Sequence, residues 1–153
     1  MKTIKNFLTT ALFLLLVISN ILVAQDSTKT TSKNNGNLIL KITGFDSDEG
    51  YVMIALCNSQ ENYDMQPPYI GTGAEIVEGK SQHIFENLPY GEYAIKCFHD
   101  ENTNGKLDTN IMGIPKESYG FSNNATGSFG PAKYEDAKFK FSKDSQVAEI
   151  EVH

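Results

Sequence analysis

The alternation of apolar and polar residues predicts a chain built mainly from short β-strands. Leu38, Leu40 and Ile42 fall on one side of a strand over residues 38–43. Residues 51–57 are nearly all apolar, which is typical of a central strand that is covered on both faces. The other strands predicted in this half of the chain cover residues 74–77, 82–86 and 93–98.

The clearest alternation comes near the C-terminus. Residues 137–141 alternate apolar side chains with lysine, and residues 148–152 alternate apolar side chains with glutamate. A Ser-Lys-Asp-Ser turn separates the two runs. They are therefore predicted to form a hairpin whose outer faces carry opposite charges.

About seven short strands, with no convincing helix among them, predict an all-β domain. The class expected is an antiparallel β-sandwich of immunoglobulin-like or transthyretin-like kind, and the sequence leaves that choice of topology open. Residues 100–135 show no helical or alternating period. Their apolar side chains, among them Ile111 and Phe129, argue against disorder, so this segment is predicted to be one long ordered loop.

The first residues predict an exported protein. Lys2 and Lys5 precede an apolar run, so residues 1–24 are predicted to be a secretory signal peptide, with cleavage near Ala24. The longest unbroken apolar stretch is shorter than the ~20 residues that a spanning helix needs. After cleavage the protein is thus expected in the periplasm or medium, and not as an integral membrane protein.

Two regions follow the signal peptide. Residues 25–37 are polar and show no apolar period, so they predict a flexible tether. Residues 38–153 are long enough for a core and are predicted to form one β-sandwich domain.

The charge balance excludes nucleic acid as a partner. The chain carries 13 basic and 19 acidic residues, and every basic residue is lysine. Phosphate recognition needs clustered positive charge, which this acidic chain lacks. An acidic exported protein is a more natural partner for cations.

One stretch, His99–Asp108, carries the strongest candidate chemistry. Its oxygen-bearing side chains and Gly105 match the order of an EF-hand calcium loop at positions 1, 3, 5, 6 and 9. Alternate residues of a tightly curled loop point inward, so their oxygens converge on one hard cation. The candidate calcium ligands are the side chains of Asp100, Asn102, Asn104 and Asp108 and the backbone carbonyl of Lys106.

The match to an EF-hand is incomplete. Position 12 is Ile111 in place of a bidentate glutamate, and a predicted strand precedes Asp100. The stretch is therefore either a calcium-type loop at the end of a strand or an Asx-rich turn. Because calcium takes 6–8 oxygens, Glu117, Asn123 and Asn124 are candidate additional ligands. The alternative for both asparagines is a left-handed turn position.

Two cysteines and one histidine are the candidates for redox or catalytic roles. Cys57 and Cys97 each lie in an apolar run, either as a disulfide pair or as two separate buried thiols. Cys97 and His99 share a strand face, but residues two apart are poorly placed to act as nucleophile and base. His99 is instead expected to orient the loop or cap the strand. No cluster has the spacing of a zinc site.

The sequence resembles the exported bacterial proteins grouped as domain-of-unknown-function family 2141. The resemblance rests on LPYGEYAIKCFHDENTNGKLDTNIMGIPKESYGFSNN (residues 88–124), on FGPAKYEDAKF (residues 129–139) and, more weakly, on VMIALCNSQENY (residues 52–63). The resemblance implies a β-sandwich fold, and the family it points to has no established activity. The LPYGEY turn is also similar to the LPxGxY corner of carboxypeptidase-regulatory and collagen-adhesin B-type repeats, which bears on fold alone.

Two hypotheses for function remain at this level. The first is a non-enzymatic exported module with a calcium-type loop, which binds an unidentified envelope or extracellular ligand through its long loop. The second is an enzyme of unknown chemistry, hydrolysis included, with Glu117 or His99 as its acid–base group. The number of titratable groups that converge in one concave site discriminates between them.

Overall fold

The computed structural model describes residues 34–65 and 67–153, and the predicted signal peptide lies outside these residues. The strands are β1 (Asn35–Thr43), β2 (Tyr51–Cys57), β3 (Ile70–Ala74), β4 (Lys80–Pro89), β5 (Gly91–Asp100), β6 (Tyr119–Phe121), β7 (Phe139–Phe141) and β8 (Ser145–Glu151). The helices are α2 (Gln60–Asp64), the 3-10 turn η1 (Ser122–Asn124) and α3 (Tyr134–Ala137). In the described part of the chain, no helix is both long and apolar enough to cross a membrane.

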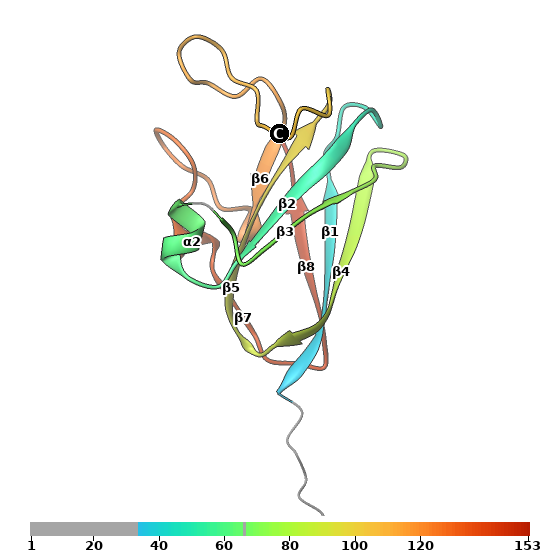
Figure 1. Ribbon diagram of the computed structural model, residues 1–153, viewed down its shortest axis with the longest axis vertical. Helices are drawn as coiled ribbons and strands as arrows, with labels where there is room; N and C mark the ends of the chain where they lie inside the picture. The colour runs from blue at the N-terminus through green and yellow to red at the C-terminus, as the bar shows by residue number, and fades with distance from the viewer. Residues whose placement is uncertain (1–33, 66) are drawn as a thin grey trace, which may run out of the picture. The chain divides into compact units, whose positions relative to one another are not determined.

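The strands form two sheets, which confirms the all-β prediction (Figure 1). One sheet has the order β4-β1-β8, and the other has the order β3-β2-β5-β6, with β7 also paired to β5. All pairs are antiparallel except β1 and β8, which run parallel. A purely antiparallel arrangement was therefore a wrong prediction for this one pair.

The two sheets share one hydrophobic core, which explains why the strand pattern was readable. In β1 and β2 every second side chain enters this core, and the intervening positions face outward. Full burial of such an aliphatic side chain contributes roughly 1.5–3 kcal/mol. The core residues contributed by the strands include Leu38, Leu40, Ile42, Val52, Ile54, Leu56, Ile95, Phe141 and Ile150.

The predicted C-terminal hairpin is wrong. β7 pairs with β5 in one sheet, whereas β8 pairs with β1 in the other, so the chain crosses between the sheets after Phe141. Each strand has a single apolar face, and pairing in either sheet would bury that face. Alternation alone therefore did not identify which strand each one pairs with. Lys138 forms its ion pairs with Glu135 at 2.9 Å and Glu92 at 3.9 Å rather than with a glutamate of β8.

Other boundaries differ from the prediction for local reasons. β1 begins at Asn35, so the last residues of the predicted tether belong to the sheet. β3 ends at Ala74, where the predicted strand 74–77 was to begin. A short helix, α2, forms where the sequence showed no convincing helix, because Ser59 and Asn62 form a capping box, with each side chain bonded to the other's backbone N–H at 3.4 Å.

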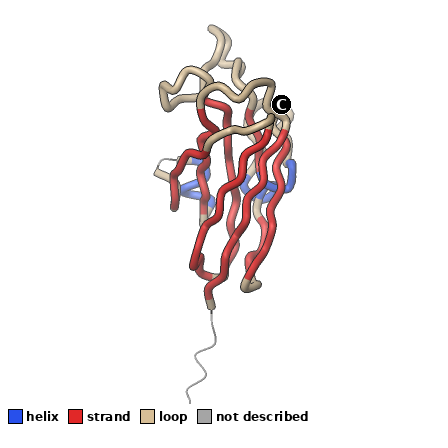
Figure 2. Tube along the Cα trace, turned by 90° about the vertical axis from the view of Figure 1, so that its right-hand side faces the viewer, coloured by secondary structure: helices blue, strands red, loops and turns tan. Residues whose placement is uncertain are grey.

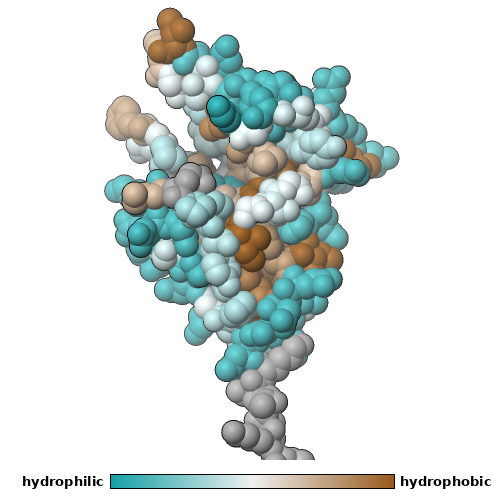
Figure 3. Space-filling model, in the orientation of Figure 1, coloured by the Kyte–Doolittle hydropathy of each residue, from teal (hydrophilic) through white to brown (hydrophobic). Residues whose placement is uncertain are grey.

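The predicted long loop over residues 100–135 is divided by regular structure. β6 and η1 lie within it, and they separate two irregular segments, 101–118 and 125–133. Both segments lie toward the same end of the domain (Figures 1 and 2). Ile111 in the first and Phe129 in the second are fully exposed. Figure 3 shows apolar colour at the end of the uppermost loop and a notch beneath it.

Candidate functional site

Asp100 ends β5 and anchors the candidate calcium loop from inside the domain. Only 3% of the residue is exposed. Its carboxylate accepts the backbone N–H of Asn104 at 2.9 Å and that of Gly105 at 2.8 Å. The loop curls around this carboxylate because Gly105 adopts a φ of 75°, which costs a glycine little.

The next predicted ligands converge on Asp108. The side-chain amides of Asn102 and Asn104 donate to its two carboxylate oxygens at 2.7 Å and 3.1 Å. The amide oxygen of Asn102 accepts the N–H of Asn104 at 3.1 Å, and that of Asn104 accepts the N–H of Lys106 at 2.8 Å. These bonds are those of an Asx-rich turn, and they gather the same side chains that a calcium loop requires.

Glu117, one of the additional candidate ligands, lies against the loop. Its residue exposure is 7%. One carboxylate oxygen accepts the N–H of Glu101 at 3.2 Å, and the other accepts the N–H of Asp108 at 2.7 Å. Glu117 therefore holds the two ends of the loop together, with a lone pair remaining on each oxygen.

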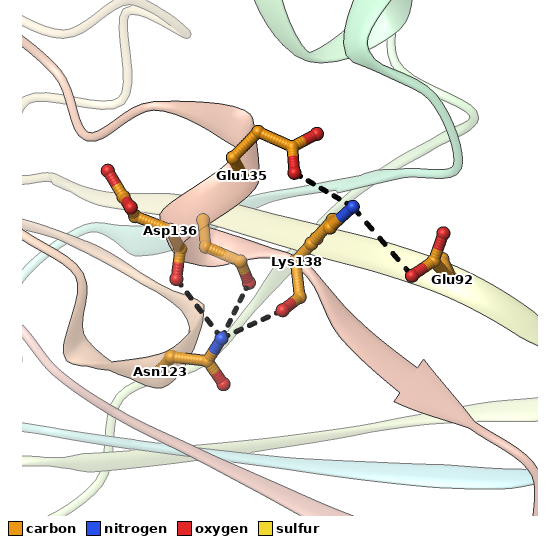
Figure 4. A network of polar contacts seen from close by, with 6 residues as sticks. Glu92, Asn123, Glu135, Asp136 and Lys138 are labelled. Carbon is orange, nitrogen blue, oxygen red and sulfur yellow. Dashed lines mark hydrogen bonds and ion pairs between the residues drawn. The ribbon is translucent and has the colours of Figure 1, made fainter.

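Asn123 and Asn124 do not join this loop, so their selection as additional ligands was wrong. The side-chain amide of Asn123 donates to the carbonyls of Asp136, Ala137 and Lys138 at 2.9–3.2 Å (Figure 4). The side-chain oxygen of Asn124 accepts a backbone N–H from β8 at 2.9 Å. Both residues have left-handed φ angles, 60° and 48°, as the alternative proposed.

His99 is buried behind the loop rather than open to it. Its ring packs edge-on against Phe45 at 5.2 Å, and its Nε2 lies 2.6 Å from the carbonyl oxygen of Glu49. Among the residues that the structure describes, Nδ1 has no hydrogen-bond partner, and it lies 3.6 Å from a carboxylate oxygen of Glu101. This position suits a residue that fixes the start of the loop to the turn before β2.

The two cysteines lie on opposite faces of the β2–β5 pair. Cys97 belongs to the core between the sheets, whereas Cys57 belongs to a second cluster on the outer face. Both thiols are free, so the disulfide alternative is wrong and the buried-thiol alternative holds. Burial raises the pKa of Cys97 to about 12, which keeps the thiol protonated and unreactive near neutral pH.

A groove of about 670 Å³ opens on the outer face of the β3-β2-β5-β6 sheet. The sequence reading missed it because the apolar outer face of β2 was taken to be covered. The signal available was the pair of glycines at Gly71 and Gly73. The residues that line the groove include Met53, Ala55, Pro68, Gly71, Gly73, Lys96, Phe98, Leu107, Tyr119, Phe121 and Pro131.

The groove and the loop are neighbours, because the segment Gly105–Leu107 forms part of the groove lining. Within residues 34–65 and 67–153, no three His, Cys, Asp or Glu side chains gather as a metal site. The loop offers two carboxylates, Asp100 and Asp108, together with amide oxygens. This donor set suits a hard cation far better than zinc.

Two sheets around one core, with an Asx-rich loop beside an apolar groove, define a small all-β domain. The chain belongs to the family described as "Uncharacterized protein conserved in bacteria (DUF2141)", whose model matches residues 40–149. The earlier resemblance is thereby confirmed. Neither the curated proteins nor the solved structures contain a match to this chain.

Proposed function

We propose that this protein is an exported, non-enzymatic binding module in which calcium stabilises the loop Asp100–Asp108. The two sheets would then form a sandwich of immunoglobulin-like or transthyretin-like kind, with the loop end as the recognition surface for an envelope or extracellular ligand. The observation that carries the proposal is the convergence of Asn102 and Asn104 on the carboxylate of Asp108.

Calcium binding requires a small rearrangement of this cluster. Both asparagines now present their N–H₂ groups to Asp108, and coordination needs their amide oxygens instead. Rotation of the two amides would place neutral oxygens beside a carboxylate. The Lys106 carbonyl and Glu117 are the proposed further ligands, and Glu117 can coordinate through its remaining lone pairs.

The acid–base candidates support a binding module over an enzyme. His99 is fully buried, and both carboxylate oxygens of Glu117 already accept backbone N–H groups. A general acid or base has to reach the proton that it transfers. The groove itself is lined mainly by apolar residues, so few titratable groups converge in one concave site.

Calcium is expected to raise the melting temperature of the protein. The loop supplies only two formal charges, so the expected Kd is on the order of 10⁻⁴–10⁻³ M. Calcium at ~10 mM would then stabilise the fold by roughly 1.4–2.7 kcal/mol. Magnesium should do less, since it demands a smaller and stricter shell. The measurement is a melting curve in calcium, in magnesium and in chelator.

Two variants separate a bound ion from a general charge effect. Asp108→Asn should abolish the calcium shift, whereas Asp46→Asn, at an exposed aspartate in the turn before β2, should retain it. Equal midpoints in all three solutions for the wild type, or loss of the shift in both variants, would leave the loop as an Asx-rich turn only.

Export is tested separately, because the predicted signal peptide lies outside the described residues. The intact mass of protein recovered from the periplasm or medium should correspond to a chain that starts near Gln25. Recovery of the full-length chain in the cytosol alone would contradict export.

A further inference from the structure

The floor of the groove consists of two rows of residues that cross β3, β2, β5 and β6 of the five-stranded sheet. Strand register aligns the residues of each row, and all of them point away from the core. The first row is Gly73, Met53, Phe98 and Tyr119, and the second is Gly71, Ala55, Lys96 and Phe121. Each row is small on the β3 side and aromatic on the β6 side, which leaves a shelf beside an aromatic wall.

The two glycines keep this shelf open. A Cβ atom at Gly73 would lie 3.5 Å from the sulfur of Met53, and one at Gly71 would lie 3.4 Å from Cγ of Pro68. Both distances are ordinary van der Waals contacts, so a side chain would fit there and fill the groove. The volume of about 670 Å³ falls within the ~300–1,000 Å³ range of small-molecule sites.

Lys96 is the cation at the centre of this apolar floor. Its ammonium group donates to the backbone carbonyl of Tyr63 and lies 4.9 Å from the centroid of that ring. The ion pairs of the described residues are formed by His99 and by Lys138, and none of them includes Lys96. A half-buried ammonium without a carboxylate is only partly compensated by a carbonyl and a ring.

We propose that the groove binds a small apolar molecule that carries one anionic group. Its apolar body lies over Met53 and Phe98, and its anion pairs with the remaining N–H groups of Lys96. The inference rests on the proposed function only in taking the chain to be a binding module. It does not require calcium, because Gly105–Leu107 only borders the groove and neither the rows of its floor nor Lys96 belongs to the loop.

The test uses two fluorescent probes that share an anilinonaphthalene body and differ in charge. These are 1-anilinonaphthalene-8-sulfonate, an anion, and neutral N-phenyl-1-naphthylamine. Lys96→Met keeps most of the apolar stem and removes the charge. The variant should therefore bind the anionic probe at least tenfold more weakly, while its affinity for the neutral probe should change less than twofold. Lys143→Met, at an exposed position in the turn before β8, removes the same charge and should leave the binding of both probes unchanged.

A second variant tests the place of binding without touching Lys96. Gly73→Val suits an extended strand and fills the shelf, so it should weaken both probes at least tenfold without lowering the melting temperature. Equal affinity of the anionic probe for the wild type and Lys96→Met overturns the proposal, and so does binding that survives Gly73→Val. All titrations are run both with chelator and with calcium. Whether the loop binds calcium is decided separately by the melting curves, so failure of the calcium proposal and failure of the groove proposal can be distinguished.

Discussion

Asp100→Ala is expected to lower the free energy of unfolding by about 2–4 kcal/mol even in chelator. The carboxylate accepts two backbone N–H groups from a position that is 3% exposed. Each hydrogen bond to a charged group contributes ~1.5–3 kcal/mol to stability. Water that enters the opened loop forms hydrogen bonds with the freed N–H groups and offsets part of the lost free energy. The measurement is urea unfolding of the variant and the wild type without calcium.

Asp48→Ala is the matched control for this experiment. The Asp48 carboxylate also accepts two backbone N–H groups, those of Glu78 and Gly79, each at 2.8 Å, but the residue is exposed. Water replaces these bonds readily, so the expected cost is only about 1 kcal/mol. If Asp100→Ala costs no more than Asp48→Ala, the buried carboxylate does not organise the loop.

Gly120→Val is expected to lower the free energy of unfolding by about 2–3 kcal/mol through overpacking. A Cβ atom at this position of β6 would lie 2.7 Å from Cγ2 of Ile150 and 3.1 Å from the carbonyl oxygen of Glu151. β6 or β8 would have to shift, and β6 carries the aromatic wall of the groove. Urea unfolding measures the loss directly.

Gly73→Val provides the comparison, since it is the same substitution in another strand of the same sheet. The nearest atom to a Cβ there is 3.5 Å away, so no destabilisation is expected. Equal stability of the two variants would mean that Gly120 is not fixed by close packing against β8.

The sequence predicted what depends on local spacing. Alternation over residues 38–43 located β1, because a side-chain period of two follows directly from one buried face. The apolar run 51–57 located β2, because a short continuous apolar run is typical of a central strand. The convergence of Asn102, Asn104 and Asp108 was also predictable, since these residues lie within one tight loop.

Features that depend on distant partners were not predictable in this way. β6 is too short to show a period, and it carries the chain away from the loop, so Asn123 and Asn124 bond to α3 and β8 instead. The groove could be recognised only once the register of four strands was known. Lys96 shows nothing unusual in the sequence, and only the assembled sheet shows that no ion pair within residues 34–65 and 67–153 includes it.

The parallel pairing of β1 with β8 has a consequence for how the domain folds. β1 is the central strand of its sheet, yet one of its two partners is β8, the last strand that the structure describes. Such distant pairing gives a high contact order, which slows folding toward the millisecond-to-second range. Until β8 arrives, one edge of β1 stays bare and can recruit a strand from another molecule. A nascent or C-terminally truncated chain should therefore aggregate unless it is kept unfolded.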